Sequence, residues 1–277
     1  MILSADILEC FDREVRLDDG ERESAYQREQ DGGVRRVIGP FPTAPHNWID
    51  HYALDAANTE AAIQRQLDRF HGLRHAFRWK IYSHDRPVGL GEILLRRGFR
   101  RLGSSSLLVI DVRRYDATPT PGFHFPVLTE PDELPATMRP VLLAVWPDGA
   151  DDLIASLQDE LRSPGDNVRI VAAQRADRPV GCGLVRFGHS RVFGGLFAGA
   201  TVPDERGKGV YRGLVAARVL AARQAGVRYL YTEAGAMSSP ILRRLGFQEI
   251  ATITDYVSPE PETDFVGEPA GNASQCG

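Results

Sequence analysis

The spacing of apolar and polar residues predicts that helices and strands alternate along most of this 277-residue chain. Between residues 207 and 225, apolar side chains recur near the 3.6-residue period of an amphipathic helix, at Val210, Leu214, Val215, Val219 and Ala222. Two apolar runs, 168–174 and 180–187, flank the turn-forming sequence Ala176-Asp177-Arg178-Pro179. These two runs predict a β-hairpin.

The second half of the chain shows the fullest pattern. Its expected order is one strand, two helices and three strands, followed by helix, strand, helix and strand. The corresponding segments are 123–129, 129–145, 151–162, 168–174, 180–187, 191–202, 207–225, 227–232, 238–245 and 248–257. Strands and helices mixed in this way predict an α/β layered sheet with both parallel and antiparallel pairs.

Part of this order recurs in the first half. The sequence Ile93-Leu94-Leu95-Arg96-Arg97-Gly98-Phe99 resembles Ile241-Leu242-Arg243-Arg244-Leu245-Gly246-Phe247. The first copy lies at the end of the second helix in a series of helix, strand, helix and strand, expected at 58–71, 76–82, 88–97 and 106–112. We interpret this as duplication of a domain, because two copies are too few for a solenoid. A coincidence between two arginine-rich helices ending in Gly-Phe is the alternative.

Proline and glycine mark the expected boundaries. Residues 114–122 are polar and contain Pro119, Pro121 and Gly122, which is typical of a linker. The last residues show almost no periodicity. We therefore expect domains at 1–113 and 123–257, joined by this linker and followed by a disordered tail at 258–277.

Composition narrows the classes of function. Apolar residues make up 43% and charged residues 25%, which is typical of a globular protein, and the net charge is −4. The chain thus lacks the basic surplus of a dedicated nucleic-acid binder. Cys10, Cys182 and Cys276 are far apart, so neither a metal site nor a disulfide framework is expected. No basic signal-peptide start and no apolar run of about 18 residues is present, so we expect a soluble cytoplasmic protein without membrane contact.

The segment 200–214 carries the candidate chemistry. An apolar run leads through an acidic turn into Gly207-Lys208-Gly209 and then directly into a long helix. A helix start presents unpaired N–H groups and a partial positive charge, and glycines let a phosphate approach them. A Walker A loop requires Ser or Thr after the lysine, where Gly209 stands. A dinucleotide fingerprint requires a third glycine at Arg212. Neither pattern fits.

This segment resembles the acyl-CoA cradle of the GCN5-related N-acetyltransferases (GNATs). Arg206-x-x-Gly209-x-Tyr211 is similar to the Arg/Gln-x-x-Gly-x-Gly/Ala signature of that family, and Leu245-Gly246-Phe247 matches its Leu-Gly-Phe. Residues 123–257 follow the family's order of elements. The resemblance implies two tandem acyl-CoA N-acyltransferase-like domains, each a mixed, mostly antiparallel sheet flanked by helices. A homodimer is compatible with this resemblance.

The resemblance implies that acetyl-CoA is the co-substrate, with no metal, and that an amine of a small molecule or peptide attacks its thioester directly. Backbone groups of Ala200, Thr201 and Val202 would pair with the pantetheine arm, and the Val202 N–H would polarise the thioester carbonyl. Arg206 opens the signature, and the pyrophosphate would be held by N–H groups of the residues after it. These residues are Gly207, Lys208, Gly209, Val210, Tyr211 and Arg212.

The sequence departs from the family pattern at several positions. Tyr211 stands where Gly or Ala is usual, so we expect its ring on the core side. Leu242 stands where many members have a tyrosine that protonates the thiolate, and we expect Leu242→Tyr to be tolerated. Glu233 is the nearest carboxylate and our candidate base. An acyl-CoA-binding sensor without turnover is therefore the alternative function.

The first copy has lost the cradle. Asp55-Ala56-Ala57-Asn58-Thr59-Glu60 stands at the corresponding place and contains two acids and no glycine. We therefore expect residues 1–113 to bind no CoA. Trp48, Asp50, His51 and Tyr52 are expected on a strand, where core packing at a sheet edge is favoured over an acceptor site.

Overall fold

The computed structural model describes residues 4–18, 26–118, 120–163, 165 and 167–261. Cys276 and most of the expected tail lie outside these residues. The chain divides into two compact units, and neither is a continuous stretch. Unit 1 contains Met1–Tyr26, Ile81–Asp85 and Gly103–Asp255, and unit 2 contains the remainder.

Unit 1 is built on a mixed sheet with the strand order β11-β5-β10-β9-β8-β7-β6. Four neighbouring pairs are antiparallel, namely β5–β10, β8–β9, β7–β8 and β6–β7, whereas β9 and β10 are parallel. The strands are β5 (Arg100–Asp111), β6 (Val127–Leu128), β7 (Val168–Arg175), β8 (Arg178–Phe187), β9 (Phe193–Thr201), β10 (Tyr229–Ala234) and β11 (Gln248–Val257). The predicted hairpin corresponds to β7 and β8.

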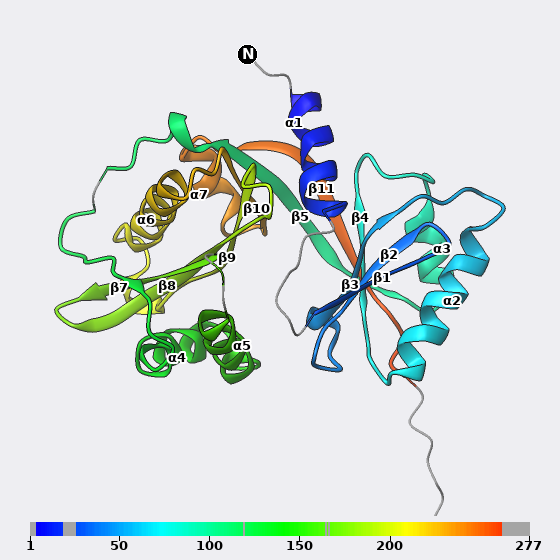
Figure 1. The fold of residues 1–277 in the computed structure, drawn as a ribbon, viewed down its shortest axis with the longest axis horizontal. Helices are drawn as coiled ribbons and strands as arrows, with labels where there is room; N and C mark the ends of the chain where they lie inside the picture. Colours follow the sequence, from blue (N-terminus) through cyan, green and yellow to red (C-terminus); the bar gives the residue numbers. More distant parts are fainter. Residues whose placement is uncertain (1–3, 19–25, 119, 164, 166, 262–277) are drawn as a thin grey trace, which may run out of the picture. The chain divides into compact units, whose positions relative to one another are not determined.

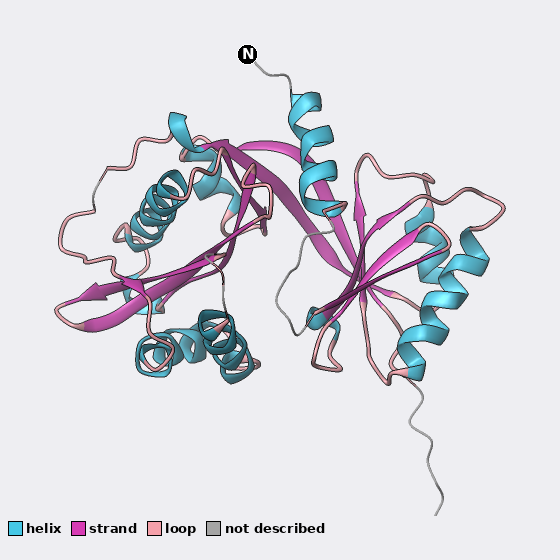
Figure 2. Ribbon diagram, in the orientation of Figure 1, coloured by secondary structure: helices cyan, strands magenta, loops and turns pink. Residues whose placement is uncertain are grey.

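Helices cover both faces of this sheet (Figure 2). One face carries α4 (Glu133–Val145) and α5 (Ala150–Arg162), and the other carries α6 (Val210–Gln224) and α7 (Ser239–Arg244). Two short 3₁₀ helices, η3 (Val112–Arg114) and η4 (Pro203–Glu205), follow β5 and β9. The result is a helix–sheet–helix sandwich, the layered α/β class expected from the sequence.

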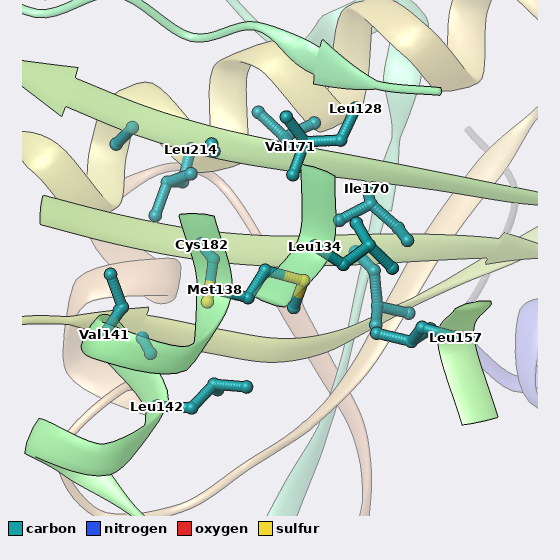
Figure 3. Packing of buried hydrophobic residues seen from close by; sticks show 14 of the residues in the cluster. Leu128, Leu134, Met138, Val141, Leu142, Leu157, Ile170, Val171, Cys182 and Leu214 are labelled. Atoms are coloured by element: carbon teal, nitrogen blue, oxygen red, sulfur yellow. The ribbon is translucent and has the colours of Figure 1, made fainter. Parts of the chain in front are cut away.

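Apolar side chains point to both faces of the sheet, so a hydrophobic core forms on each face. Figure 3 labels Ile170 and Val171, two successive residues of β7, within one buried cluster that also contains Leu134 of α4 and Leu214 of α6. Because successive side chains on a strand point to opposite faces, the unbroken apolar run of β7 packs against both helical layers.

Unit 1 also takes segments from the first part of the chain. β5 pairs with β10 over six residues, from Tyr229↔Asp111 to Ala234↔Ser106. Phe11, at the end of α1 (Ser4–Phe11), packs edge-on against Phe193, with 5.7 Å between ring centroids. The sequence boundary at residue 113 assigned both segments to the N-terminal domain. Strand exchange is a long-range pairing, which local periodicity does not show.

The strands of unit 2 follow the order β1-β2-β3-β4. Its elements are β1 (Gln27–Asp31), β2 (Val34–Ile38), η2 (Ala44–His46), β3 (Asn47–Tyr52), α2 (Thr59–Gly72), β4 (Arg78–Tyr82) and α3 (Leu90–Arg96). The pairs β1–β2 and β2–β3 are antiparallel, and β3–β4 is parallel. The sequence analysis assigned no element to 27–38, nor to α1 and the π-helical turn η1 (Asp12–Arg16) that follows it.

The internal repeat is visible in the structure. β3-α2-β4-α3 has the same order of elements as β9-α6-β10-α7. Both short helices end in the same way, because the Phe99 N–H donates to the Leu94 carbonyl at 3.0 Å and the Phe247 N–H donates to the Leu242 carbonyl at 3.1 Å. Gly98 and Gly246, at φ +84° and +91°, permit these turns. In the described part of the chain, no helix is long and apolar enough to cross a membrane.

Candidate functional site

The site begins where β9 and β10 separate. Their parallel pairing covers only Phe193–Gly195 and Tyr229–Tyr231. The Thr232 hydroxyl then donates to the Leu196 carbonyl at 3.1 Å, yet β9 continues to Thr201. Among the described strands, none pairs with β9 on this side beyond that point. Open α/β sheets bind ligands beyond the carboxyl ends of parallel strands, and this gap lies at such a place.

A β-bulge reshapes β9 at this point. Its register against β8 changes from Leu184↔Phe197 to Cys182↔Ala200, so β9 contains one extra residue. Ala198 takes the left-handed conformation, with φ +49°. A bulge bends its strand and frees backbone groups from the ladder.

A buried arginine supports this bulge. Arg218 on α6 is only 1% exposed. Its Nη1 donates to the carbonyls of Leu184 and Phe197, both at 3.4 Å, and its Nε donates to the Leu214 carbonyl at 3.0 Å. Burial lowers the pKa of the guanidinium. The charge is thus held by backbone carbonyls around the bulge.

Two glycines make room for that side chain. A Cβ at Gly183 would lie 2.9 Å from Nη1 of Arg218, and a Cβ at Gly199 would lie 3.6 Å from its Nη2. The sequence pattern alone did not identify Arg218 as a residue of the site. Its one sequence signal is that it interrupts the apolar face of 207–225, next to Val219.

The predicted cradle corresponds to the start of α6. Gly207 and Gly209 have φ values of +77° and +89°, which glycine adopts without strain. The N-cap residue is Gly209, which has no side chain that could accept a hydrogen bond from the first N–H groups of the helix. The first N–H groups of α6 therefore remain available to an anion. A Cβ at Gly207 would meet open space, whereas one at Gly209 would lie 3.0 Å from Cγ2 of Thr120.

The charges around the cradle are already partly paired. Nζ of Lys208 lies 3.2 Å from Glu205, whose carboxylate also pairs with Arg175 at 3.1 Å. Glu205 is only 4% exposed, so these two cations compensate a buried charge. The ammonium of Lys208 is thus already engaged in an ion pair. Arg206 donates from Nε to the Thr201 carbonyl at 3.3 Å and secures the end of β9.

The expected role of the Val202 N–H conflicts with its geometry. It donates to the Val180 carbonyl of β8 at 3.0 Å and is therefore engaged. In a regular antiparallel ladder, alternate residues direct their N–H groups to opposite sides. The Thr201 N–H therefore points away from β8, toward the gap left by β10. Thr201 Oγ1 is also buried without a hydrogen-bond partner in the described chain, as expected beside a ligand site.

Leu242, at the position of the family's tyrosine, and Glu233, the candidate base, lie on opposite faces of the sheet. Leu242 is fully buried and packs in a cluster with Leu108 and Leu230. Alternation along β10 places Tyr231 and Glu233 on the other face. Glu233 is half-buried and lies opposite Leu107 of β5. A phenol at position 242 would meet packed core, which argues against the tolerance expected for Leu242→Tyr.

Tyr211 lies on the core side of α6. A Cβ at Gly199 would lie 3.1 Å from its Cε2 atom, so the ring packs on the bulged strand. Burial raises the pKa of its phenol. The usual small residue of the signature is thus replaced by a ring that points away from the cradle.

The corresponding loop of unit 2 is closed by its own side chains. The Asp55 carboxylate accepts from the N–H groups of Ala57 and Asn58, both at 2.9 Å. Asn58 Oδ1 accepts from the Asp55 N–H at 2.9 Å. A carboxylate therefore occupies the amides that a phosphate would need, in contrast to the uncapped start of α6.

Comparison with solved structures identifies the fold. No protein-family model matches the chain, and no curated protein matches its sequence. Solved structures match over most of its length. A GCN5-related N-acetyltransferase from Kribbella flavida has a TM-score of 0.71 at 15% identity, covering 94% of this chain and 96% of that one.

Two further structures agree. A GCN5-related N-acetyltransferase from Sphaerobacter thermophilus has a TM-score of 0.62 at 12% identity, with 92% and 84% of the two chains covered. A tandem GNAT protein from the clavulanic acid biosynthesis pathway has a TM-score of 0.59 at 15% identity, with 88% and 86% covered. The chain therefore has the GNAT fold.

Proposed function

We propose that this chain, which has the GNAT fold, is an acetyl-CoA-dependent N-acetyltransferase acting on a primary amine of a small molecule or peptide. One observation carries the proposal. The gap between β9 and β10 leads directly to an uncapped helix start at Gly209, so one end of the site suits a diphosphate and the other an extended arm.

The residues of the site fit the parts of acetyl-CoA. N–H groups from Gly207 to Arg212 would hold the diphosphate. The free edge of β9 would pair with the pantetheine arm as another strand does, since amide groups along that arm need hydrogen-bond partners. Thr201, with its N–H directed into the gap and its hydroxyl unpaired, is the residue best placed to bind near the thioester.

Acetyl-CoA supplies the acetyl group as a thioester. The acceptor amine would attack the acetyl carbon, so that a C–N bond forms and the C–S bond breaks. The amine must arrive unprotonated and must lose a further proton as the amide forms. Glu233, on the face of β10 opposite α7, is the proposed proton acceptor through a water. No phenol is needed at position 242 in this scheme, because a CoA thiol is acidic enough to leave without one.

The binding half of the proposal is tested at Gly207. Asn and Asp both tolerate a positive φ and have nearly the same shape. Asp adds a negative charge beside the diphosphate, so Gly207→Asp should weaken acetyl-CoA binding about tenfold more than Gly207→Asn, or about 1.4 kcal/mol. Isothermal titration calorimetry measures both variants and also the stoichiometry. One molecule per chain is expected, since Asp55 closes the other loop.

The catalytic half is tested by thiol release. Wild-type protein with acetyl-CoA and a panel of primary amines should release CoA thiol in an amine-dependent manner. Binding without release for any amine would contradict the transferase proposal. Equal affinity of the Gly207→Asn and Gly207→Asp variants would contradict the placement of the diphosphate.

A further inference from the structure

A small cavity lies beside the proposed cofactor cradle, within unit 1. Its volume is about 220 Å³, and its lining comes from the first turn of α6, the end of α7 and the segment after η3. The lining residues are Tyr115, Asp116, Thr118, Arg212, Arg244 and Leu245. Pockets for whole drug-sized ligands are typically about 300–1,000 Å³, so this one suits a part of a larger molecule.

The outer wall of the cavity is fixed in place. The Arg223 Nε donates to the Val112 carbonyl at 2.8 Å, and its Nη2 donates to the Tyr115 carbonyl. The Tyr115 side chain is buried among the residues packed between α6 and the sheet. Hydrogen bonds from α6 therefore hold the chain at Val112 and Tyr115, next to the cavity.

Two arginines line this cavity, and the charge of Arg212 partly offsets the rise that burial causes in the pKa of the Tyr115 phenol. Within the described chain, neither Arg212 nor Arg244 makes a side-chain hydrogen bond or an ion pair. Neighbouring arginines behave differently, since Arg243 pairs with Glu249 and Arg228 pairs with Asp111 at 2.9 Å. Two unpaired guanidinium groups at one cavity are the donor set that binds a phosphate monoester.

The third charged group in the cavity, the Asp116 carboxylate, suits the nucleoside part of a nucleotide. Asp116 lines the same cavity and is an acceptor, which matches a ribose hydroxyl or the exocyclic amine of adenine. Arg212 belongs both to the cavity and to the first turn of α6. A ligand whose diphosphate sits on that turn would therefore reach the cavity with its adjoining nucleoside.

We propose that Arg212 and Arg244 bind the 3′-phosphate of the CoA nucleotide in this cavity. The inference rests on the proposed function, because it takes acetyl-CoA as the ligand. It goes beyond that proposal by assigning a second phosphate site outside the cradle signature, and it makes Arg244 a determinant of CoA recognition.

The test compares acetyl-CoA with its 3′-dephospho analogue on the full-length protein by titration calorimetry. The wild-type protein should bind acetyl-CoA about tenfold or more tightly than the analogue. In Arg244→Gln, affinity for acetyl-CoA should fall while affinity for the analogue stays unchanged, so that the preference is largely lost. Arg212→Gln should reduce the preference in the same direction.

A matched control exists in the other copy. Arg96 is exposed at the corresponding place in α3, two residues before Gly98, and Arg96→Gln should leave the preference intact. Equal wild-type binding of both ligands would overturn this inference and leave the proposed function standing. Full preference retained in both variants would overturn it too. No binding of either ligand would contradict the proposed function itself, and this inference with it.

Discussion

Glu233 is the residue on which the chemical proposal depends most. It is the second-last residue of β10, half-buried, and lies on the face opposite α6 and α7. The thioester is proposed to lie along the far end of β9, so a carboxylate here is placed to receive a proton through a water.

We expect Glu233→Gln to lower turnover by about 10²–10⁴-fold, the range for losing a general base. Affinity for acetyl-CoA should remain unchanged, because the proposed diphosphate contacts come from main-chain groups. Steady-state thiol release and calorimetry measure the two quantities. Glu92→Gln, an exposed carboxylate on α3, is the control and should change neither. Wild-type turnover in Glu233→Gln would remove this residue from the mechanism.

At the scale of elements, α6 serves both sides of the site. Its N-terminus offers free N–H groups, and its buried Arg218 holds the bulge of β9 about two turns further along the helix. Burying a guanidinium costs free energy, so hydrogen bonds to the Leu184 and Phe197 carbonyls must offset that cost. The helix thus connects the proposed diphosphate end of the site to the strand that borders the gap.

Replacing Arg218 by methionine should therefore destabilise unit 1, since an unpaired buried carbonyl costs about 1–3 kcal/mol. The urea midpoint should fall, and acetyl-CoA affinity should fall with it as the bulge relaxes. Arg218→Lys keeps a donor and should recover part of both losses. If Arg218→Met unfolds at the wild-type midpoint and binds acetyl-CoA normally, the bulge does not depend on this side chain.

At the scale of the whole chain, the two halves are interleaved. β5 from the first half pairs with β10, and Phe11 of α1 packs on Phe193, both within unit 1. The proposed domain at 123–257 therefore lacks a strand and a helix that its own sheet uses.

A fragment of residues 123–257 should accordingly fail to unfold cooperatively. Without β5, the edge of β10 is exposed, and such an edge pairs with other chains. Circular dichroism during heating and size-exclusion chromatography would show a broad transition and aggregation. Co-expression of residues 1–122 with 123–277 should restore a sharp transition, because the missing strand returns on a second chain. A stable, monomeric 123–257 fragment would show that this strand exchange is dispensable.

The sequence by itself determined the local features. The periodicity at Val210, Leu214 and Val219 predicted α6, and the β11 segment matches its predicted bounds of 248–257. The glycines at 207 and 209 predicted the location of the proposed cradle, because glycines before a helix start let an anion approach its N–H groups. Propensity, turn chemistry and capping act over a few residues, so one sequence is enough to show them.

Only the tertiary structure decided the rest. The register of β9 with β8 determines which N–H groups are free. The Val202 N–H bonds to Val180, so the proposed thioester contact is the Thr201 N–H and not the Val202 N–H expected from the sequence. The pairing of Lys208 with Glu205, the burial of Leu242 and the placing of β5 beside β10 also depend on neighbours distant in sequence. Register, burial and ion pairing are set by contacts across many residues, and local patterns contain no record of them.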